Sequence, residues 1–295
     1  MSATALDSLP MTDSQAAAEP AVAVPSRLRL VLRSPVFLVG AVVLLFWIGC
    51  ALFGPSLVPY PPYADDLLHT LAPPSAAHWF GTDQLGRDIF SRVIVGARPI
   101  LSVAPAATLL ATVAGATLGL LTGYVGGWLD AVIGRLIEVL LALPLIVVAL
   151  LVLVALGPSS VTVIAVIGVI FTPLIARTVR AAVLAERSHD YVAAAELRGE
   201  GALHIMFVEI LPNVLPPILV ETTVRLGYAI FTVASLSFLG FGIQPPSADW
   251  GLAISENYGM ITGGYWWTVA FAAGATASLV VGVNLVADGI QAALE

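Results

Sequence analysis

Long apolar stretches alternate with short polar segments along most of this chain. The first stretch, "SPVFLVGAVVLLFWIGCALFGPSLV", is long enough to cross a bilayer and predicts a transmembrane helix over residues 27–57. Together the stretches predict an all-α membrane protein with about six transmembrane helices, five of them in a core over residues 99–290. The apolar segments of that core lie at about residues 99–122, 131–156, 160–178, 213–240 and 265–288.

The polar segments set the expected topology. Residues 1–26 are rich in Ala, Ser and Pro without periodicity, which predicts a disordered cytoplasmic tail. The first apolar run starts too late and is too long for a cleaved signal peptide, so we expect a retained helix. Arginines precede this run and gather again in the 179–212 connection, and six crossings place both clusters and both termini in the cytoplasm. These arginines are Arg27, Arg29, Arg33, Arg177, Arg180, Arg187 and Arg198.

Residues 58–98 form a proline-rich polar loop that this topology places outside the cell. Its second half has the pattern of an amphipathic helix lying on the membrane surface. Arg87, Arg92 and Arg98 go against the positive-inside rule there, but the clusters elsewhere decide the orientation.

Proline and glycine within the apolar segments predict local features of the helices. Pro144, Pro173, Pro216 and Pro217 predict kinks. The glycine-rich patch "GATLGLLTG" predicts a close approach between two helices.

The composition supports the membrane assignment and excludes some activities. The chain is 59% hydrophobic and 11% charged, with a mean hydropathy of +0.97, whereas soluble domains have about 25% charged residues. All 12 basic residues are arginines. A Walker A loop and Schiff-base chemistry both need a lysine, so any ATP hydrolysis must come from a partner.

Residues 191–212, "YVAAAELRGEGALHIMFVEILP", interrupt the apolar pattern with a polar helix-turn-helix. Strong helix formers precede Gly199 and Gly201, where the backbone can turn, and a second short helix with apolar positions follows. Pro212 then falls near the first turn of the next span. Two short rigid helices would suit docking to a cytoplasmic partner, and a structural surface helix is the alternative.

This stretch resembles the EAA loop of binding-protein-dependent ABC importer permeases, with its small and acidic residues, Gly199 and the "ILP" ending at residues 210–212. In that family the loop holds a coupling helix that inserts into a cleft of the ATPase subunit. Where the family usually has glutamate this chain has Ala193, so the charged contact would be missing or supplied by Glu196 or Glu200. The resemblance assigns ATPase coupling to Tyr191, Ala193, Ala194, Ala195, Glu196, Gly199, Leu203, Ile210, Leu211 and Pro212, within a coupling loop of about residues 185–212.

Further motifs narrow the resemblance. "HWFGTDQLGRDIFSRVIVGAR", "GYVGGWLDAVIGRLIEVLLALP" and "GYAIFTVASLSFLGFGIQPPSADWG" are similar to blocks of the C-type permease subunits of dipeptide, oligopeptide and nickel importers. With "NLVADGIQAAL" the similarity covers about residues 33–294. Val233 departs from it, because many relatives have an acid at this position.

The resemblance implies a type I ABC importer permease bundle that pairs with a second permease subunit. It also implies two ATPase subunits, which would bind ATP and Mg, and an extracytoplasmic substrate-binding protein. The implied substrate is a di- or oligopeptide, with nickel or glutathione as alternatives. We expect no cofactor in this chain itself, membrane lipid around the spans, and no nucleic-acid partner.

The signature of the outer loop has a structural interpretation and a functional one. Asp83 and Asp88 can pair with Arg87 or Arg92 and cap a helix N-terminus, which would fix how the loop enters the next span. Contact with the ligand or its binding protein is the alternative. The signature residues are Gly81, Thr82, Asp83, Gly86, Arg87, Asp88 and Arg92.

Ionisable residues at membrane depth are candidates for the transport path. Glu221 and Arg225 are four residues apart and can neutralise each other along one helix face, as can Arg135 and Glu138. If the first pair faces a cavity, it could meet the termini of a zwitterionic peptide. Asp130 and Asp288, near predicted cytoplasmic ends, fit hydrated helix caps better than proton relays.

No catalytic constellation is found in the sequence. The four histidines, His69, His78, His189 and His204, lack metal-ligand spacing, so we predict no metal site and no enzyme activity in this chain. Two rivals remain for the function. An ion-coupled secondary transporter would need unpaired acids at mid-membrane, and a membrane scaffold would not need a docking segment.

Overall fold

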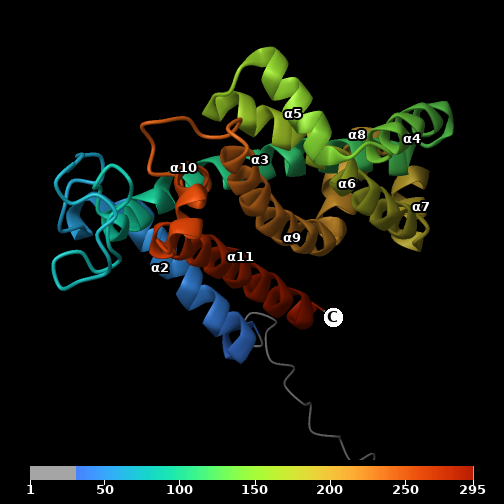
Figure 1. Cartoon of the computed structure of the whole chain (residues 1–295). Coiled ribbons are helices and arrows are strands. Elements are labelled where there is room, and N and C mark those ends of the chain that lie inside the picture. The colour runs from blue at the N-terminus through green and yellow to red at the C-terminus, as the bar shows by residue number, and fades with distance from the viewer. Residues whose placement is uncertain (1–30, 295) are drawn as a thin grey trace, which may run out of the picture.

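The computed structural model describes residues 31–294, which fold almost entirely into helices (Figure 1). The predicted tail over residues 1–26 lies outside the described residues. In chain order the helices are α2 (Pro35–Leu57), α3 (Ile89–Val125), α4 (Gly127–Leu141), α5 (Leu145–Leu156), α6 (Ser160–Arg187), α7 (Asp190–Leu197), α8 (Ala202–His204), the π-helix η1 (Ile205–Ile210), α9 (Leu211–Phe238), α10 (Trp250–Asn257), the 3₁₀-helix η2 (Tyr258–Gly263) and α11 (Trp267–Leu294).

Five helical stretches of the described chain are long and apolar enough to cross a membrane, and a bent pair would make a sixth. This agrees with the predicted number of about six. The five stretches are Pro35–Leu57, Ile89–Val125, Ser160–Arg187, Ala202–Phe238 and Trp267–Ala292, and the bent pair is α4 with α5.

The predicted span over residues 131–156 is wrong in form, because it is two helices that meet at 89°. Pro144 immediately precedes α5, and a proline disfavours the helical conformation in the residue before it. The kink predicted at Pro144 is therefore a complete break. The helices α6 and α9 instead continue through Pro173 and through Pro216 and Pro217.

The boundary of the first core span is also corrected, because α3 begins at Ile89 and not near residue 99. The segment expected on the membrane surface is the buried start of this helix. Asp88 caps it by accepting a hydrogen bond from the Ser91 N–H at 2.8 Å. The Trp250 indole, fully buried, donates to the Val93 carbonyl at 2.8 Å. The start of α3 is thus covered by α10, a partner distant in the sequence, and by α2.

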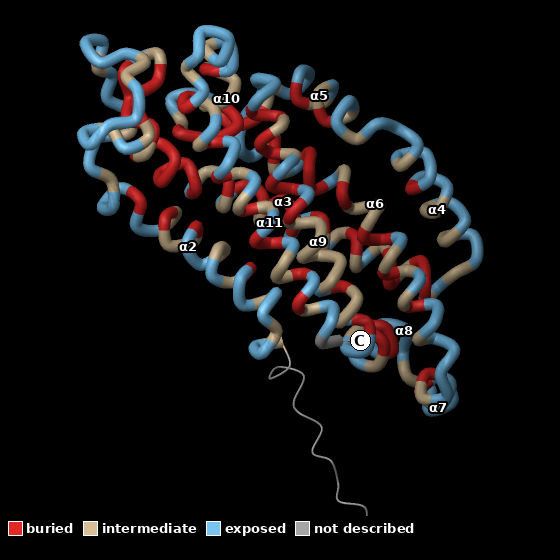
Figure 2. The backbone as a smooth tube through the Cα atoms, turned by 60° about the horizontal axis from the view of Figure 1, so that its bottom comes forward, coloured by how far each residue is buried: buried red, intermediate tan, exposed pale blue. Residues whose placement is uncertain are grey.

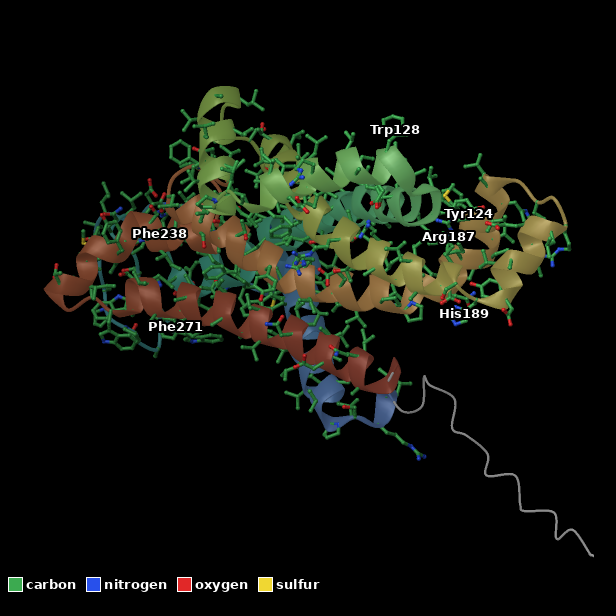
Figure 3. The ribbon with its side chains drawn as sticks, turned by 90° about the vertical axis from the view of Figure 1, so that its right-hand side faces the viewer. Tyr124, Trp128, Arg187, His189, Phe238 and Phe271 are labelled. Atoms are coloured by element: carbon green, nitrogen blue, oxygen red, sulfur yellow. The ribbon has the colours of Figure 1, made fainter. Side chains whose placement is uncertain are left out.

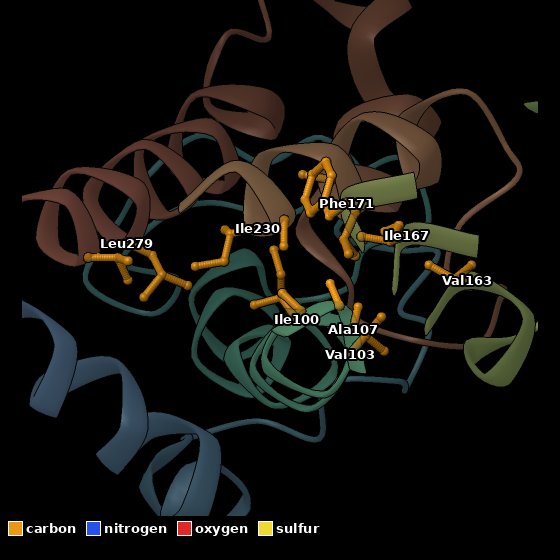
Figure 4. Close-up of a cluster of buried hydrophobic side chains, with 14 of the residues drawn as sticks. Ile100, Val103, Ala107, Val163, Ile167, Phe171, Ile230 and Leu279 are labelled. Carbon is orange, nitrogen blue, oxygen red and sulfur yellow. The ribbon is translucent and has the colours of Figure 1, made fainter. Parts of the chain in front are cut away.

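The core lies where α3, α6, α9 and α11 meet (Figure 4). Ile100 and Ala107 of α3, Ile167 of α6, Ile230 of α9 and Leu279 of α11 are all buried there. In a membrane this packing is driven by close van der Waals contact rather than by the hydrophobic effect.

Glycines let α3 and α6 approach each other closely, as the "GATLGLLTG" pattern predicts. A Cβ atom at Gly119 would lie 2.6 Å from the Cβ of Val179, and one at Gly123 would lie 2.8 Å from that of Val183. Any larger side chain at these positions would push the helices apart, so the predicted close approach is confirmed.

The helix α2 packs along α11 and α3 and leaves its remaining faces open (Figure 1). Trp47 donates from its indole N–H to the Ser278 hydroxyl at 2.9 Å across this contact. Val42 and Leu52 on the open faces are 67% and 68% exposed, as expected for a helix in contact with lipid.

The spans leave two polar regions at opposite ends of the molecule (Figure 2). The loop end comprises residues 58–88 and 240–264, including α10. The connector comprises residues 188–212, with α7, α8 and η1, at the far end.

Candidate functional site

The connector contains the helix-turn-helix that the sequence predicts. The first helix, α7, ends at Leu197 in a Schellman motif, in which the N–H of Glu200 bonds to the Ala195 carbonyl at 3.2 Å and that of Gly199 to the Glu196 carbonyl at 3.0 Å. Gly199 has a φ of +77°, a conformation that costs other residues about 1 kcal/mol or more. The geometry of the turn alone therefore explains why residue 199 is a glycine.

The second helix of the connector runs directly into a membrane span. The residues of α8 and η1 continue into α9 without an intervening loop, so that Ala202–Phe238 is one helical stretch. π-helical segments inside α-helices occur frequently at functional sites. A displacement of the connector would therefore be transmitted straight into α9.

Some residues of the connector hold it to the bundle. Val192, Ala195, Ile205, Met206 and Ile210 are all buried. Ala195 and Ile210, both predicted to contact the ATPase, are anchors that face the bundle and not the surface.

Other residues of the connector face outward. Leu197 is 90% exposed and Leu203 is 68% exposed, and Phe207 and Val208 are also exposed. Leu197 lies in α7, outside the candidate membrane spans, where an exposed apolar side chain is a candidate for contact with a partner. Leu197 was not among the predicted contacts. Of the predicted set, Ala193, Ala194, Glu196, Gly199, Leu203 and Pro212 are exposed, while Tyr191 and Leu211 are half-buried.

Hydrogen bonds fix the orientation of α7 relative to its neighbours. The Tyr191 hydroxyl donates to Glu186 of α6 at 2.8 Å and accepts from the Asn213 amide of α9 at 3.1 Å. The same amide donates to the Glu209 carbonyl at 2.9 Å. Burial and the hydrogen bond to Glu186 raise the pKa of Tyr191, so the hydroxyl keeps its proton for this bond.

A stacked arginine supports the helix end beside the connector. The Arg187 guanidinium lies 5.6 Å from the centre of the Tyr124 ring, within the range of a cation–π contact (Figure 3). The contact joins the last turns of α3 and α6, just before the connector (Figure 3).

The expectation that the histidines are scattered needs a correction at His204. Ligand atoms of His204, Glu200 and Glu209 lie within 4.8 Å of one another, because the chain folds back after Gly201. Arg198 already compensates this group, with contacts of 2.7 Å to Glu200 and 3.4 Å to Glu209. The hydrogen bond to Glu200 raises the pKa of Arg198.

The loop end contains a compact network of buried charges. The Arg87 Nε donates to Asp83 at 2.7 Å, and its Nη2 donates to Glu256 of α10 at 2.8 Å. Arg92 lies 3.8 Å from Asp83 and 3.6 Å from Glu256. Burial opposes the charge on Arg87, but Asp83 and Glu256 outweigh it and raise the pKa of this side chain.

The predicted pairing in the signature is confirmed for Asp83 and corrected for Asp88. Asp83 contacts both arginines, whereas Asp88 caps α3 and contacts the His78 ring at 2.9 Å instead. Glu256 was missed, because it lies 169 residues from Arg87 in the chain.

The backbone of the signature explains its glycine and threonine. Gly86 has a φ of +74°, and a Cβ atom there would collide with the Asp66 carbonyl. Thr82 is fully buried, and its hydroxyl accepts from the Ala72 N–H at 2.8 Å. The other signature residue in positive φ is Gly81, at +76°. The signature therefore builds a rigid, internally bonded loop.

Two charged pairs on the spans neutralise themselves as predicted. Glu221 and Arg225 on α9 are 2.6 Å apart, and Arg135 and Glu138 on α4 are 3.2 Å apart. The first pair is mostly buried, and Arg225 lines a cavity between α5, α6 and α9.

The interpretation of Asp130 as a hydrated cap is wrong. Asp130 of α4 accepts two hydrogen bonds from the Arg180 guanidinium of α6, at 2.5 and 2.6 Å. Such a two-point contact is a strong and geometrically specific one. It ties α4 to α6 close to the connector.

Comparison with known proteins decides the family. Residues 115–295 match the binding-protein-dependent transport system inner membrane component, and residues 28–74 match the N-terminal transmembrane domain of oligopeptide transport permease C. The chain belongs to this family of transport-system membrane components. It is a multi-pass inner-membrane protein, and its family implies a transport system with further subunits.

Known permeases resemble the chain over most of its length. A probable D,D-dipeptide transport system permease protein of Escherichia coli K12 is 37% identical over 262 residues, covering 89% of this chain and 88% of that protein. A dipeptide permease of Bacillus subtilis 168 is 38% identical over 263 residues, covering 89% and 82%. An oligopeptide permease of the same organism is 36% identical over 258 residues, covering 88% and 84%.

These matches confirm the resemblance drawn from the sequence motifs. The relatives are permease components and not ATPases, which agrees with the lack of a P-loop lysine in this chain. The matched range 115–295 includes the connector and α9.

Proposed function

We propose that this chain is a transmembrane permease subunit of an ATP-driven importer for di- or oligopeptides. It forms half of the translocation path, and the second half comes from another permease subunit. An extracytoplasmic binding protein delivers the peptide at the loop end. Two ATPase subunits, which bind ATP and Mg, dock on the connectors of the two permeases. Both termini of the chain lie in the cytoplasm.

The observation that carries the proposal is the architecture of the connector. Its exposed apolar side chains, Leu197 and Leu203 among them, need a partner, while Tyr191 and Ile210 hold it in place. Because α8 and η1 continue into α9, a partner that moves the connector tilts a span. ATP hydrolysis in the partner thereby alternates access to the path.

The names of the relatives support a peptide as substrate. The three relatives described above are named for D,D-dipeptides, dipeptides and oligopeptides. The same permease architecture serving nickel or glutathione is the alternative, and the cognate binding protein decides between them.

The charges on the spans argue against an ion-coupled secondary transporter. Such a transporter needs acids that gain and lose protons or sodium inside the membrane. Glu221 is engaged by Arg225, and Asp130 by Arg180, which leaves both acids neutralised within the protein.

The test is uptake of a labelled dipeptide by proteoliposomes that contain both permeases, both ATPase subunits and the binding protein. We expect uptake that requires ATP and stops when the ATPase subunits carry an inactivating change in their Walker B carboxylate. Uptake that continues with those inactive subunits under a proton or sodium gradient would contradict the proposal.

A further inference from the structure

One face of α9 carries polar side chains that helix packing does not require. Glu221, Arg225, Tyr228, Thr232 and Ser235 follow one another at spacings of three or four residues, which places them on one face of the helix. Polar and charged groups within a span generally face the bundle interior or a cavity.

That face borders a hollow between helices. Arg225, Tyr228, Thr232 and Ser235 line a cavity of about 390 Å³ between α5, α6 and α9. Its size falls in the range of small-molecule sites, and its remaining walls are apolar. Among the described residues that line it, Arg225 is the one that carries a charge.

The Arg225 guanidinium is held in place, but not all of its hydrogen-bond donors are used. Its Nε donates to Glu221 at 2.6 Å, and its central carbon lies 5.4 Å from the centre of the Tyr228 ring. Within the described part of the chain, its two Nη groups make no hydrogen bond. A guanidinium fixed through Nε presents its Nη edge to an incoming anion.

We propose that Arg225 binds the C-terminal carboxylate of the peptide as it passes through this cavity. This inference rests on the proposed importer function. The two Nη groups match the two oxygens of a carboxylate, and such paired hydrogen bonds are strong in an apolar setting. Glu221 pairs with Arg225 through Nε whether or not a peptide is bound, which lowers the cost of keeping a charge at this depth. A lipid phosphate shares this anionic chemistry, so the test must separate the two sources.

The test compares a dipeptide with its C-terminal carboxamide in the complete reconstituted complex. Both peptides are supplied at concentrations that saturate the binding protein. The test variant is the double substitution Arg225→Gln with Glu221→Gln, which removes both charges and leaves no acid unpaired. The control is Arg135→Gln with Glu138→Gln, a pair of the same kind on α4 whose side chains are 80% and 69% exposed.

We expect the test variant to lower uptake of the carboxylate peptide roughly tenfold more than uptake of the carboxamide. The preference of the binding protein cancels, because the same protein serves both complexes. The control should change both rates by less than about twofold.

Equal losses for the two peptides would overturn the assignment. A loss of uptake that depends on the anionic lipid content of the liposomes would also overturn it, because Arg225 would then bind a lipid phosphate. Failure of the test variant to assemble with the second permease would overturn it too, since the pair would then be a subunit contact. ATP-dependent uptake by the unaltered complex is read separately, and its absence would count against the importer function itself.

Discussion

The two polar ends of this molecule use their charged side chains differently. At the loop end, the buried side chains of Arg87 and Arg92 contact both Asp83 and Glu256, so the charges hold the protein's own segments together. In the connector, Leu197 and Leu203 are apolar and exposed. The loop end is thus held together by its own charges, whereas the outward face of the connector is the surface on which we propose that the ATPase docks.

This difference separates substitutions that affect stability from those that affect coupling. Removing one member of a buried ion pair typically costs about 3–5 kcal/mol, because it leaves the other charge unpaired. Truncating an exposed side chain typically changes stability by less than about 0.5 kcal/mol. Substitutions at the loop end should therefore change the stability of the protein. Substitutions on the outward face of the connector should instead change transport.

The largest effect is expected for Arg87→Ala at the loop end. It leaves Asp83 and Glu256 short of a partner, and we expect a loss of about 3–5 kcal/mol in stability. The melting temperature and membrane abundance of the complex measure it. Asp66→Asn is the matched control, because the Asp66–His69 pair in the same loop is exposed and its loss should leave the melting temperature nearly unchanged. Equal shifts in melting temperature for the two variants would show that the buried pairs contribute no more than the exposed one.

Two substitutions in the connector should distinguish its buried anchors from its outward face. Ile210→Ala deletes a fully buried side chain and should destabilise the protein by about 2–5 kcal/mol. Leu203→Ala, at an exposed position, should leave the melting temperature unchanged and weaken binding of the ATPase. If Leu203→Ala instead lowers the melting temperature as much as Ile210→Ala, the outward face is a folding element.

A pH effect is expected at Asp249 of the loop end. Burial raises the pKa of Asp249 to about 6, while its Oδ1 caps α10 by accepting from Leu252 at 2.9 Å. The folded protein thus holds a proton that the unfolded chain releases near pH 3.8, so stability falls as the pH rises toward about 6 and then levels off.

Asp249→Asn keeps the cap and removes this titration. We expect the variant to melt about a few degrees higher than the unaltered protein at pH 7.5, which is the usual change in melting temperature for a gain of about 1 kcal/mol. The gain should be smaller at pH 5. Parallel melting profiles across this pH range would show that Asp249 does not titrate there.

The smallest effect is expected for Tyr191→Phe. It removes one hydroxyl that bridges Glu186 and Asn213, which should cost about 1 kcal/mol. With α7 held less firmly, we expect fewer peptides transported per ATP hydrolysed, at an unchanged rate of hydrolysis. An unchanged transport ratio would assign the bridge to stability alone.

The sequence predicts much of the fold because apolar length reports directly on membrane spans. The α3–α6 contact was also predictable, since the glycines of "GATLGLLTG" mark a close approach. The 89° break before α5 was not, because the residues on both sides of Pro144 are equally apolar. Periodicity likewise did not predict the buried start of α3, whose partner α10 lies more than a hundred residues later in the chain.

The candidate site was predictable where its geometry is local. Gly199 was correctly placed in the turn because a Schellman motif demands a residue of positive φ within a few positions. The exposure of Leu197, the anchoring role of Ile210 and the contact between Arg87 and Glu256 all depend on segments far apart in the sequence. Each of these features required the tertiary structure.

The central claim is that the outward face of the connector transmits force from a partner ATPase. Ala194 of α7 lies on that face, and Ala64 lies exposed in the loop end, so Ala194→Glu and Ala64→Glu make a matched pair. The direct measurement is ATP-dependent peptide uptake, together with copurification of the ATPase, for both variants inserted normally in the membrane. The account predicts that Ala194→Glu abolishes both and that Ala64→Glu retains both. Normal uptake and copurification with Ala194→Glu would contradict it.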